Sequence, residues 1–284
     1  MTTIIDITSF EVTIKSLIDL FDIGRPQIIE YLKREELSCD DFLAYFSINE
    51  SNLSTVDFLV TSLHVTTNDD ECKSLNEIGL VNSIDAVTLN TPFNRHLKKH
   101  GIDIDLKMGE IKYNKQTYTF GQKFEGWSQS EERRLLEHIA YKFYCDRQIN
   151  GFFCTDNALS YGGNVNRRPE LMNNIANLLN YNKLVEDWSN NSNNKCYVIK
   201  FAIPLSTYSV ESFTNTTTFD NFKEKDIDLL KKKTIIDYSL SNIYNYVNHQ
   251  GYVCERLSFL QPDSRVKSSD FIGIYSDTEY QKTL

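Results

Sequence analysis

The chain has 284 residues, of which 40% are hydrophobic and 24% are charged. This composition is typical of a globular protein with one large core or two modest ones. No apolar run approaches the roughly 20 residues that cross a bilayer, and the start MTTIIDITSFEV lacks a basic region followed by an apolar block. We therefore expect a cytoplasmic protein with no membrane partner.

Negative charge is concentrated at the N-terminus. Residues 1–58 contain four Lys/Arg and eleven Asp/Glu, a balance of -7, which leaves 26 against 28, or -2, for the remainder. The acidic overall charge is therefore a weak argument against a polyanionic substrate. Basic residues form four short clusters, at 133–134, 167–168, 231–233 and 265–267.

The six cysteines are scattered along the chain, without a Cys-x-x-Cys pair and without a nearby pair of histidines. A tetrahedral metal site needs such clustered ligands. We expect reduced and mostly buried thiols, and no metal.

The N-terminal segment has helical periodicity. Thr8 and Glu11 stand in capping-box spacing, and the apolar residues that follow at steps of three and four are Ile14, Leu17, Ile18 and Phe21. Two further periodic runs are IIEYLKREEL and, after Ser38, DDFLAYFSI. We predict that residues 1–57 form an acidic helical subdomain, either a separate module or a cap, which recognises a target or a partner.

From residue 58 the pattern changes to short strands between helices. FLVTSLHVTT (58–67) predicts a buried strand, Gly79 ends a short helix, and NTPFNRHLKKHG predicts another helix. The alternating run IDIDLKMGEIKYNKQTYTF predicts a hairpin with a turn at Gly109. Two later helices are predicted at 131–149, where Ser128 and Glu131 have capping-box spacing, and at PELMNNIANLL. Three further strands are CYVIKFAIP, YVCERLSFL and FIGIYS. This alternation predicts the α+β class for residues 58–284.

The common phosphate-binding, dinucleotide-binding, zinc-protease and serine-hydrolase motifs are missing from the sequence. Three fragments remain, in the order LHVTTNDDECKSLNEIGL, NGFFCTDNALSYGG and GYVCERLSFLQPDSRVKSSDFIGIYS. They contain a histidine late in a strand, a Gly-aromatic-aromatic turn with a nearby tyrosine, and a glutamate at the start of a strand.

In this order the fragments resemble the ADP-ribosyltransferases, a family recognised by His, Tyr and Glu on three separate strands. His64-Val65-Thr66 looks most like the His-x-Thr form of the nucleic-acid-modifying branches, such as the DNA-modifying DarT toxins and the RNA 2'-phosphotransferases. Gly151-Phe152-Phe153 with Tyr161 resembles the poly(ADP-ribose) polymerase-like branch. Glu255 and the strand after it are similar to the part that carries the catalytic glutamate. The resemblance covers roughly residues 58–276.

The resemblance implies a split β-sheet core and NAD as substrate. It further implies a mono-ADP-ribosyltransferase of the toxin or phage-defence type, which modifies RNA or DNA and would fit an antitoxin or chaperone partner. Transfer breaks the bond between nicotinamide and ribose through an oxocarbenium-like transition state, so negative charge is needed beside the developing cation. Glu255 is expected to supply it.

The resemblance assigns the other residues to NAD binding. His64 is expected to donate to the ribose, the Val65 backbone to hold the nicotinamide amide, and Thr66 to add a hydroxyl contact. Tyr161 and Phe153 are expected to stack on the nicotinamide ring. Phe153 fits a core position equally well, and the short spacing to Tyr161 leaves Tyr141 and Tyr144 as alternatives, both on the preceding helix.

Several arginines are candidates for contacts to phosphate groups. Arg95, Arg147 and Arg167 could each meet the pyrophosphate of NAD, and the sequence does not choose among them. Arg167 and Arg168 follow the loop that carries Tyr161, so we expect them beside the nicotinamide end of the site, where a nucleic-acid acceptor passes.

Other functions stay open. A protein could be the acceptor, although Val253 stands where arginine-directed members carry an acidic residue or glutamine. An RNA 2'-phosphotransferase would rely on arginines, and Glu255 counts against it. The third alternative is a transferase-like fold without activity that acts as a binding module through its acidic N-terminus.

Overall fold

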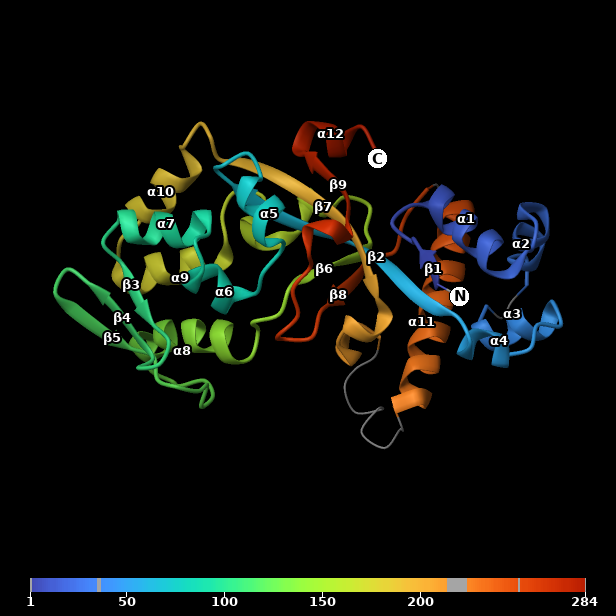
Figure 1. The fold of residues 1–284 in the computed structure, drawn as a ribbon, viewed down its shortest axis with the longest axis horizontal. Coiled ribbons are helices and arrows are strands. Elements are labelled where there is room, and N and C mark those ends of the chain that lie inside the picture. The colour runs from blue at the N-terminus through green and yellow to red at the C-terminus, as the bar shows by residue number, and fades with distance from the viewer. Residues whose placement is uncertain (1, 35–36, 214–223, 250, 284) are drawn as a thin grey trace.

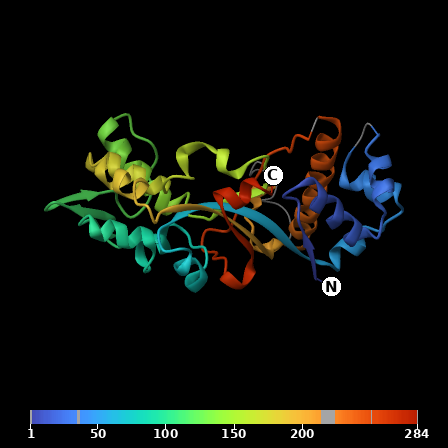
Figure 2. The ribbon, with the colours of Figure 1, turned by 90° about the horizontal axis from the view of Figure 1, so that it is seen from above.

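The computed structural model describes residues 2–34, 37–213, 224–249 and 251–283. The protein is a mixed α+β structure with a mostly antiparallel six-stranded sheet and a separate three-stranded sheet. Helices gather in two lobes at opposite ends of the large sheet (Figures 1 and 2). Among the described residues, none of the helices has the length and apolar character to cross a membrane.

The large sheet has the strand order β8-β6-β2-β7-β9, and β1 pairs with β2 in parallel outside this path. The remaining pairs are antiparallel. Its strands are β1 (Thr2–Ile5), β2 (Asp57–Asn68), β6 (Asn150–Cys154), β7 (Lys195–Pro204), β8 (Arg256–Phe259) and β9 (Phe271–Ser276).

The long strand β2 is the centre of this sheet. It pairs with β7 along ten residues, from Leu59 to Asn68, and with β6 at Leu63 and Phe152. Its many β-branched residues fit a pleated surface that is covered on both faces, and most of its side chains are buried. The strand predicted from FLVTSLHVTT is thus confirmed, as are those predicted from CYVIKFAIP and FIGIYS.

One lobe combines N-terminal helices with a helix from late in the chain. Its helices are α1 (Phe10–Phe21), α2 (Arg25–Tyr31), α3 (Cys39–Tyr45), α4 (Ser51–Ser54) and α11 (Glu224–Asn248). The three predicted N-terminal helices are present, and the Ser38 side chain caps α3 by accepting from the Asp41 amide. The cap of α1 was predicted wrongly: Ser9 is the N-cap, because the Thr8 hydroxyl donates to Asp6 instead.

The other lobe, called the 73–189 lobe, is formed by residues 73–149 and 169–189, which precede and follow β6 in the chain. Its helices are α5 (Lys73–Ile78), α6 (Ser83–Thr88), α7 (Pro92–Lys99), α8 (Glu131–Tyr144), α9 (Glu170–Leu179) and α10 (Lys183–Ser189). The predicted hairpin is a three-stranded meander of β3 (Asp103–Asp105), β4 (Glu110–Tyr113) and β5 (Gln116–Thr119). Helix α8 is capped by Ser130 rather than Ser128, because the Ser130 hydroxyl accepts from the Arg133 amide. After β9, the chain ends in a short helix, α12 (Asp277–Gln281).

Residues 1–57 share a hydrophobic core with the rest of the protein. Ile14, Leu17 and Phe42 belong to the same buried cluster as Ile235 and Leu240 of α11. Strand β1, which the sequence did not predict, joins this segment to β2 by hydrogen bonds. The N-terminal segment is therefore packed as a cap on the sheet and α11, the second of the two arrangements expected for it.

Gly79 ends α5 and brings the following turn against the C-terminal part of the chain. It has a φ of +79°, and a Cβ at this position would lie 2.0 Å from the Val266 carbonyl oxygen. The next residue, Leu80, exchanges two backbone hydrogen bonds with Val266, of 2.9 and 3.1 Å. Only glycine fits this approach, and the turn thereby becomes one wall of the cavity described below.

Candidate functional site

His64 is fixed at the junction between β2 and β6. Its Nδ1 lies 2.6 Å from the Asn150 carbonyl oxygen. A carbonyl oxygen can only accept, so Nδ1 carries the hydrogen. Burial lowers the pKa of the His64 imidazole, and the hydrogen bond to Asn150 opposes that shift only in part. The ring is therefore neutral near pH 7, and Nε2 presents a lone pair. In this tautomer Nε2 can accept a hydrogen bond, whereas the expected role of His64 was to donate one.

A small cavity of about 170 Å³ lies beside this residue, and we call it the His64 cavity. His64 and Thr66 line it together with the Ile78–Val81 turn, Pro169 and Trp188. Trp188 donates from Nε1 to the Thr67 hydroxyl at 3.2 Å, which ties α10 to β2. Both ends of the first fragment, the His-x-Thr segment and the Glu-Ile-Gly-Leu segment, thus meet at one cavity.

The edge of β2 is open next to this cavity. Leu63 pairs with Phe152 in antiparallel register, so Val65 lies opposite Asn150, the first residue of β6. Residues Thr66–Asn68 therefore extend beyond the start of β6. Gly151 makes the close approach of the two strands possible, since a Cβ there would lie 2.4 Å from the Leu63 carbonyl oxygen. Val65 itself is buried, and its predicted contact involves only its backbone.

Phe153 is a core residue, and the expectation that it stacks on a ligand is wrong. Its side chain is fully buried, with the rings of Tyr208 and Phe213 at 5.0 and 5.6 Å from its own. A bound ring would have to displace these neighbours. The alternative core assignment for Phe153 is therefore the correct one.

Tyr161 is exposed and packs edge-on against Phe152, with ring centroids 5.2 Å apart. Phe152 and its partner Leu63 point to one face of the sheet, and His64, the next residue of β2, points to the other. The structure thus places Tyr161 near the β6 strand but outside the lining of the His64 cavity. Of the alternative tyrosines, Tyr144 donates to the Gly121 carbonyl oxygen and Tyr141 packs on Phe124 and Trp127, both within the 73–189 lobe.

Glu255 lies at the opposite end of β6 from His64. It is exposed, and its Oε2 accepts a 3.4 Å hydrogen bond from the Thr155 hydroxyl. In the register of β6 and β8, Arg256 faces Cys154 and Phe259 faces Asn150. Glu255 therefore lies at the Cys154 end of β6, and His64 lies at the Asn150 end. These ends are four residue steps, or about 13 Å, apart. The structure places the three fragments on adjacent strands but does not bring Glu255 and His64 to one cavity.

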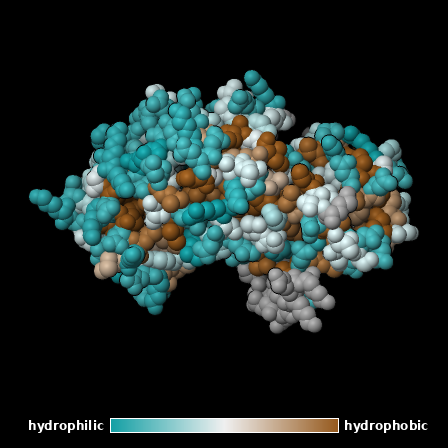
Figure 3. Space-filling view, viewed as in Figure 1, coloured by the Kyte–Doolittle hydropathy of each residue, from teal (hydrophilic) through white to brown (hydrophobic). Residues whose placement is uncertain are grey.

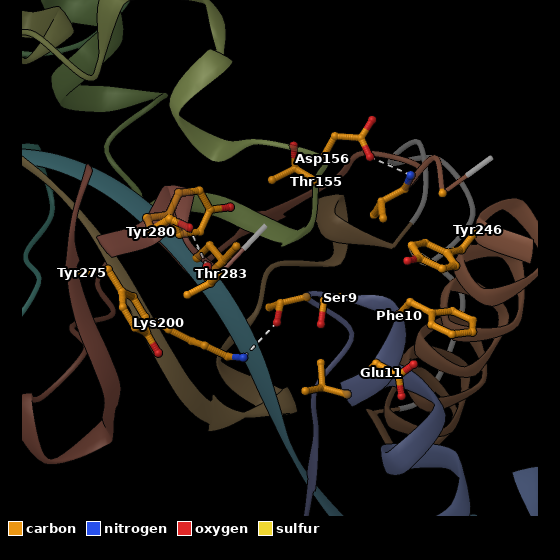
Figure 4. Close-up of a pocket in the computed structure, with 15 residues that line it drawn as sticks. Ser9, Phe10, Glu11, Thr155, Asp156, Lys200, Tyr246, Tyr275, Tyr280 and Thr283 are labelled. Carbon is orange, nitrogen blue, oxygen red and sulfur yellow. Dashed lines mark hydrogen bonds between the residues drawn. The ribbon is translucent and has the colours of Figure 1, made fainter. Parts of the chain in front are cut away.

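A second cavity, of about 420 Å³, lies on the face of the sheet opposite His64, and we call it the Lys200 cavity (Figure 4). Thr155 and Asp156 line it from the loop after β6, and Ser9 to Val12 line it from the start of α1. This cavity was not predicted from the sequence, because its walls come from segments that lie far apart along the chain.

Arg95 and Arg147, two of the arginines predicted to contact phosphate groups, already have partners within the protein. Arg95 donates to Asp70 at 2.8 Å and to the Asn90 carbonyl oxygen at 3.0 Å. Burial opposes ionisation of Asp70, but hydrogen bonds from Arg95 and Ser74 outweigh it and lower the pKa of that carboxyl. Arg95 lines a polar depression on the α7–α10 side instead of the His64 cavity, where the visible surface is mostly hydrophilic (Figure 3). Arg147 pairs with Asp263 at 3.1 Å.

Three of the four basic clusters are occupied within the fold. Lys231 and Lys232 are buried and donate to the carbonyl oxygens of Tyr208 and Leu53, so both of these lysines are used in packing within the fold. Arg265 pairs with Asp85, and Arg133 lies 3.7 Å from Glu137.

Arg167 and Arg168 are the remaining pair. Arg167 is exposed and Arg168 partly buried, and no carboxylate of the described residues lies within ion-pair distance of either. Burial lowers the pKa of Arg168, and the nearby Glu170 opposes this. Both precede Pro169, which lines the His64 cavity. The two arginines thus adjoin a residue of the cavity wall in sequence, and neither lines the cavity itself.

Comparison with protein-family models, curated proteins and solved structures finds no match to the chain. In the part of the chain that the structure describes, no group of three or more His, Cys, Asp or Glu residues is placed to hold a metal ion.

Proposed function

We propose that this chain is a mono-ADP-ribosyltransferase, with the split β-sheet core of that family, which transfers ADP-ribose from NAD to nucleic acid as a toxin or phage-defence effector. The observation that carries the proposal is the His64 cavity, where the His-x-Thr segment and the Ile78–Val81 turn meet at the open edge of β2. The adjacency of β8, β6 and β2 adds support, because these strands hold the three fragments of the resemblance.

In the proposed reaction, the bond between the nicotinamide nitrogen and ribose C1' breaks, and its electron pair leaves with nicotinamide. A nucleophilic atom of the acceptor then bonds to C1' and passes its proton to the Glu255 carboxylate. Nε2 of His64 accepts from a ribose hydroxyl, the Thr66 hydroxyl adds a contact, and the Val65 backbone holds the nicotinamide amide. These contacts orient the dinucleotide so that the bond can break.

Glu255 is the proposed source of negative charge beside the developing cation. Its position also favours a second candidate function. Because Glu255 lies at the far end of β6 and contacts Thr155, the fold could bind a nucleotide without cleaving it. Release of nicotinamide from NAD by the purified protein separates the two functions.

The decisive variant is Glu255→Gln, which keeps the shape and removes the charge. If the protein is a transferase that uses Glu255, this variant should release nicotinamide on the order of a hundredfold more slowly while it still binds NAD. Glu132→Gln, at an exposed position in α8, is the matched control and should leave turnover unchanged. Turnover that survives Glu255→Gln would remove this residue from the mechanism, and no turnover in the unaltered protein would favour the binding module. His64→Ala should weaken NAD binding.

The acceptor is proposed to be nucleic acid because Arg167 and Arg168 directly precede Pro169 of the His64 cavity and have no carboxylate partners in the described parts of the chain. Labelled NAD is incubated with the protein and with RNA, single-stranded DNA or a cell protein extract. Label should enter a nucleic acid, and its transfer should weaken steeply with salt. Arg167→Glu should reduce transfer more than nicotinamide release. Label found only in protein would contradict the proposal and identify a protein-directed enzyme.

A further inference from the structure

The Lys200 cavity lies over β2, between the N-terminal lobe and the C-terminal end of the chain. One wall is built by α1 and α11, and the facing wall by β9 and α12 (Figure 4). Leu63 and its cross-strand partner Lys200 contribute to it from the sheet. Its volume of about 420 Å³ is within the range of small-molecule sites. Because successive residues of β2 point to opposite faces, it is separate from the His64 cavity.

Aromatic side chains form both facing walls. Phe10 of α1 stacks on Tyr246 of α11, with ring centroids 4.1 Å apart and planes at 13°. Tyr275 of β9 and Tyr280 of α12 stand on the other side, and the Tyr280 hydroxyl accepts from the Ala158 amide at 3.3 Å. Phe10 is covered by Tyr246 and Arg25, and Tyr280 is buried, so Tyr246 is the ring that offers exposed flat surface to a ligand.

The positive groups around the cavity are already neutralised. Lys200 lies 2.5 Å from the Asp6 carboxylate and 2.9 Å from the Thr8 hydroxyl. Arg25, behind Phe10, donates to both carboxylate oxygens of Glu11, at 2.9 and 3.0 Å. A phosphate group in this cavity would therefore have to compete with carboxylates for each of these cations.

Asp156, by contrast, has no cation partner in the described ranges of the chain. It is exposed at the rim and accepts from the Val253 amide at 2.7 Å. No Lys, Arg or His of the described residues lies within ion-pair distance of its carboxylate. The rim thus offers hydrogen-bond acceptors to a ligand that carries donors.

We propose that the Lys200 cavity binds a nucleoside. A nucleoside has a flat base for the aromatic walls, and it has ribose hydroxyls and amino groups that donate to Asp156. It lacks the phosphate that the acidic rim disfavours. The inference does not depend on NAD cleavage, since it rests on the opposite face of the sheet and on Asp156, Tyr246 and Tyr275, which have no role in the proposed transfer reaction.

Isothermal titration calorimetry of the full chain with adenosine, guanosine, cytidine and uridine tests the proposal. At least one nucleoside should bind, and its 5'-monophosphate should bind at least about tenfold more weakly. Asp156→Asn and Tyr246→Ala should each weaken binding by about tenfold or more, with the fold checked by circular dichroism. Glu132→Gln on α8 is the control and should bind like the unaltered protein.

Three outcomes would overturn the proposal: no binding of any nucleoside, binding of the monophosphate as tight as that of its nucleoside, or binding of the organic cation agmatine in place of nucleosides. NAD binding, measured in parallel, should be unaffected by Asp156→Asn. If a nucleoside binds but the protein does not cleave NAD, the result supports this site and rejects the proposed function.

Discussion

His64 and Asn150 join β2 to β6 through one hydrogen bond, 2.6 Å long, from the imidazole Nδ1 to a backbone carbonyl oxygen. This contact determines which nitrogen of His64 is free, and it depends on how closely the two strands approach. Gly151 controls that approach because its missing side chain leaves room for the Leu63 carbonyl oxygen.

Gly151→Ala should therefore destabilise the protein and release His64. The added Cβ would meet the Leu63 oxygen at 2.4 Å, so β6 must shift, at a cost of about 1–3 kcal/mol in the free energy of unfolding. Urea denaturation measures this cost, and nitrogen NMR of the imidazole reports whether Nδ1 still carries the hydrogen. Gly162→Ala is the control, since nothing lies within 4 Å of a Cβ there. Equal stability of the two variants would contradict the proposed close approach.

Stability should fall as the pH is lowered through the range of histidine titration. Burial lowers the pKa values of His64, His96 and His100 in the folded protein. The unfolded chain, with histidine pKa values near 6.5, then binds more protons than the folded one, so the stabilisation is complete above that value and is lost below it. Tm measured between pH 7.5 and 5.5 should decrease, and His96→Gln should make the decrease shallower. A Tm that is constant or rises on acidification would rule this out.

Loss of the N-terminal cap should unfold the whole protein. A chain that begins at Ser54 lacks β1 and exposes the side of α11 that packs on α1, so we expect no cooperative thermal transition by circular dichroism. Leu17→Ala, at a fully buried position, should cost about 2–5 kcal/mol in one global transition. Lys15→Ala, at an exposed position of the same helix, should cost little. A truncated chain that melts cooperatively would instead make residues 1–57 a separate module.

Cys145 should be the first thiol to react. It is the exposed one among the six cysteines, whereas Cys39, Cys72 and Cys154 are buried. Burial raises the pKa of Cys72 to about 11 and those of Cys39 and Cys154 to about 12, so few thiolates form at pH 8. A disulfide reagent should show a fast phase that Cys145→Ser removes, and six reactive thiols in denaturant. A fast phase that survives this substitution would show that another thiol is accessible.

The sequence predicted correctly those helices and strands in which buried residues recur at a regular helical or strand spacing. The strand around His64, the helix face of Ile14 and Leu17, and the two late strands β7 and β9 all follow this rule. Strand β1 was missed because four residues carry too little pattern, and its pairing with β2 depends on a contact across more than fifty residues.

Helix α11 escaped prediction for a different physical reason. It is buried on more than one side, by the cap and by the sheet, so polar residues such as Lys232, Ser239 and Asn242 lie inside together with Ile236 and Leu240. A mixed pattern of this kind has no single apolar stripe. The lysine run at 231–233 stands out in the sequence only as a basic cluster, whereas in the structure Lys231 and Lys232 donate to backbone carbonyl oxygens.

The candidate site was predictable where it is local in sequence. His64 and Thr66 are two residues apart on a strand, so they necessarily point to the same side, and the structure places both at one cavity. The role of Phe153 was not predictable, because an aromatic residue after a glycine fits a core as well as a ligand wall. The place of Glu255 depends on the register of β8 against β6, which no local pattern fixes.

The shared core of the cap and α11 also constrains the order of events during synthesis. Residues 2–45 leave the ribosome first, yet their buried side chains pack against residues 235–243. The apolar surface of the N-terminal segment therefore stays exposed until most of the polypeptide has been synthesised. Such long-range dependence slows folding and leaves the nascent N-terminus as a binding region for chaperones.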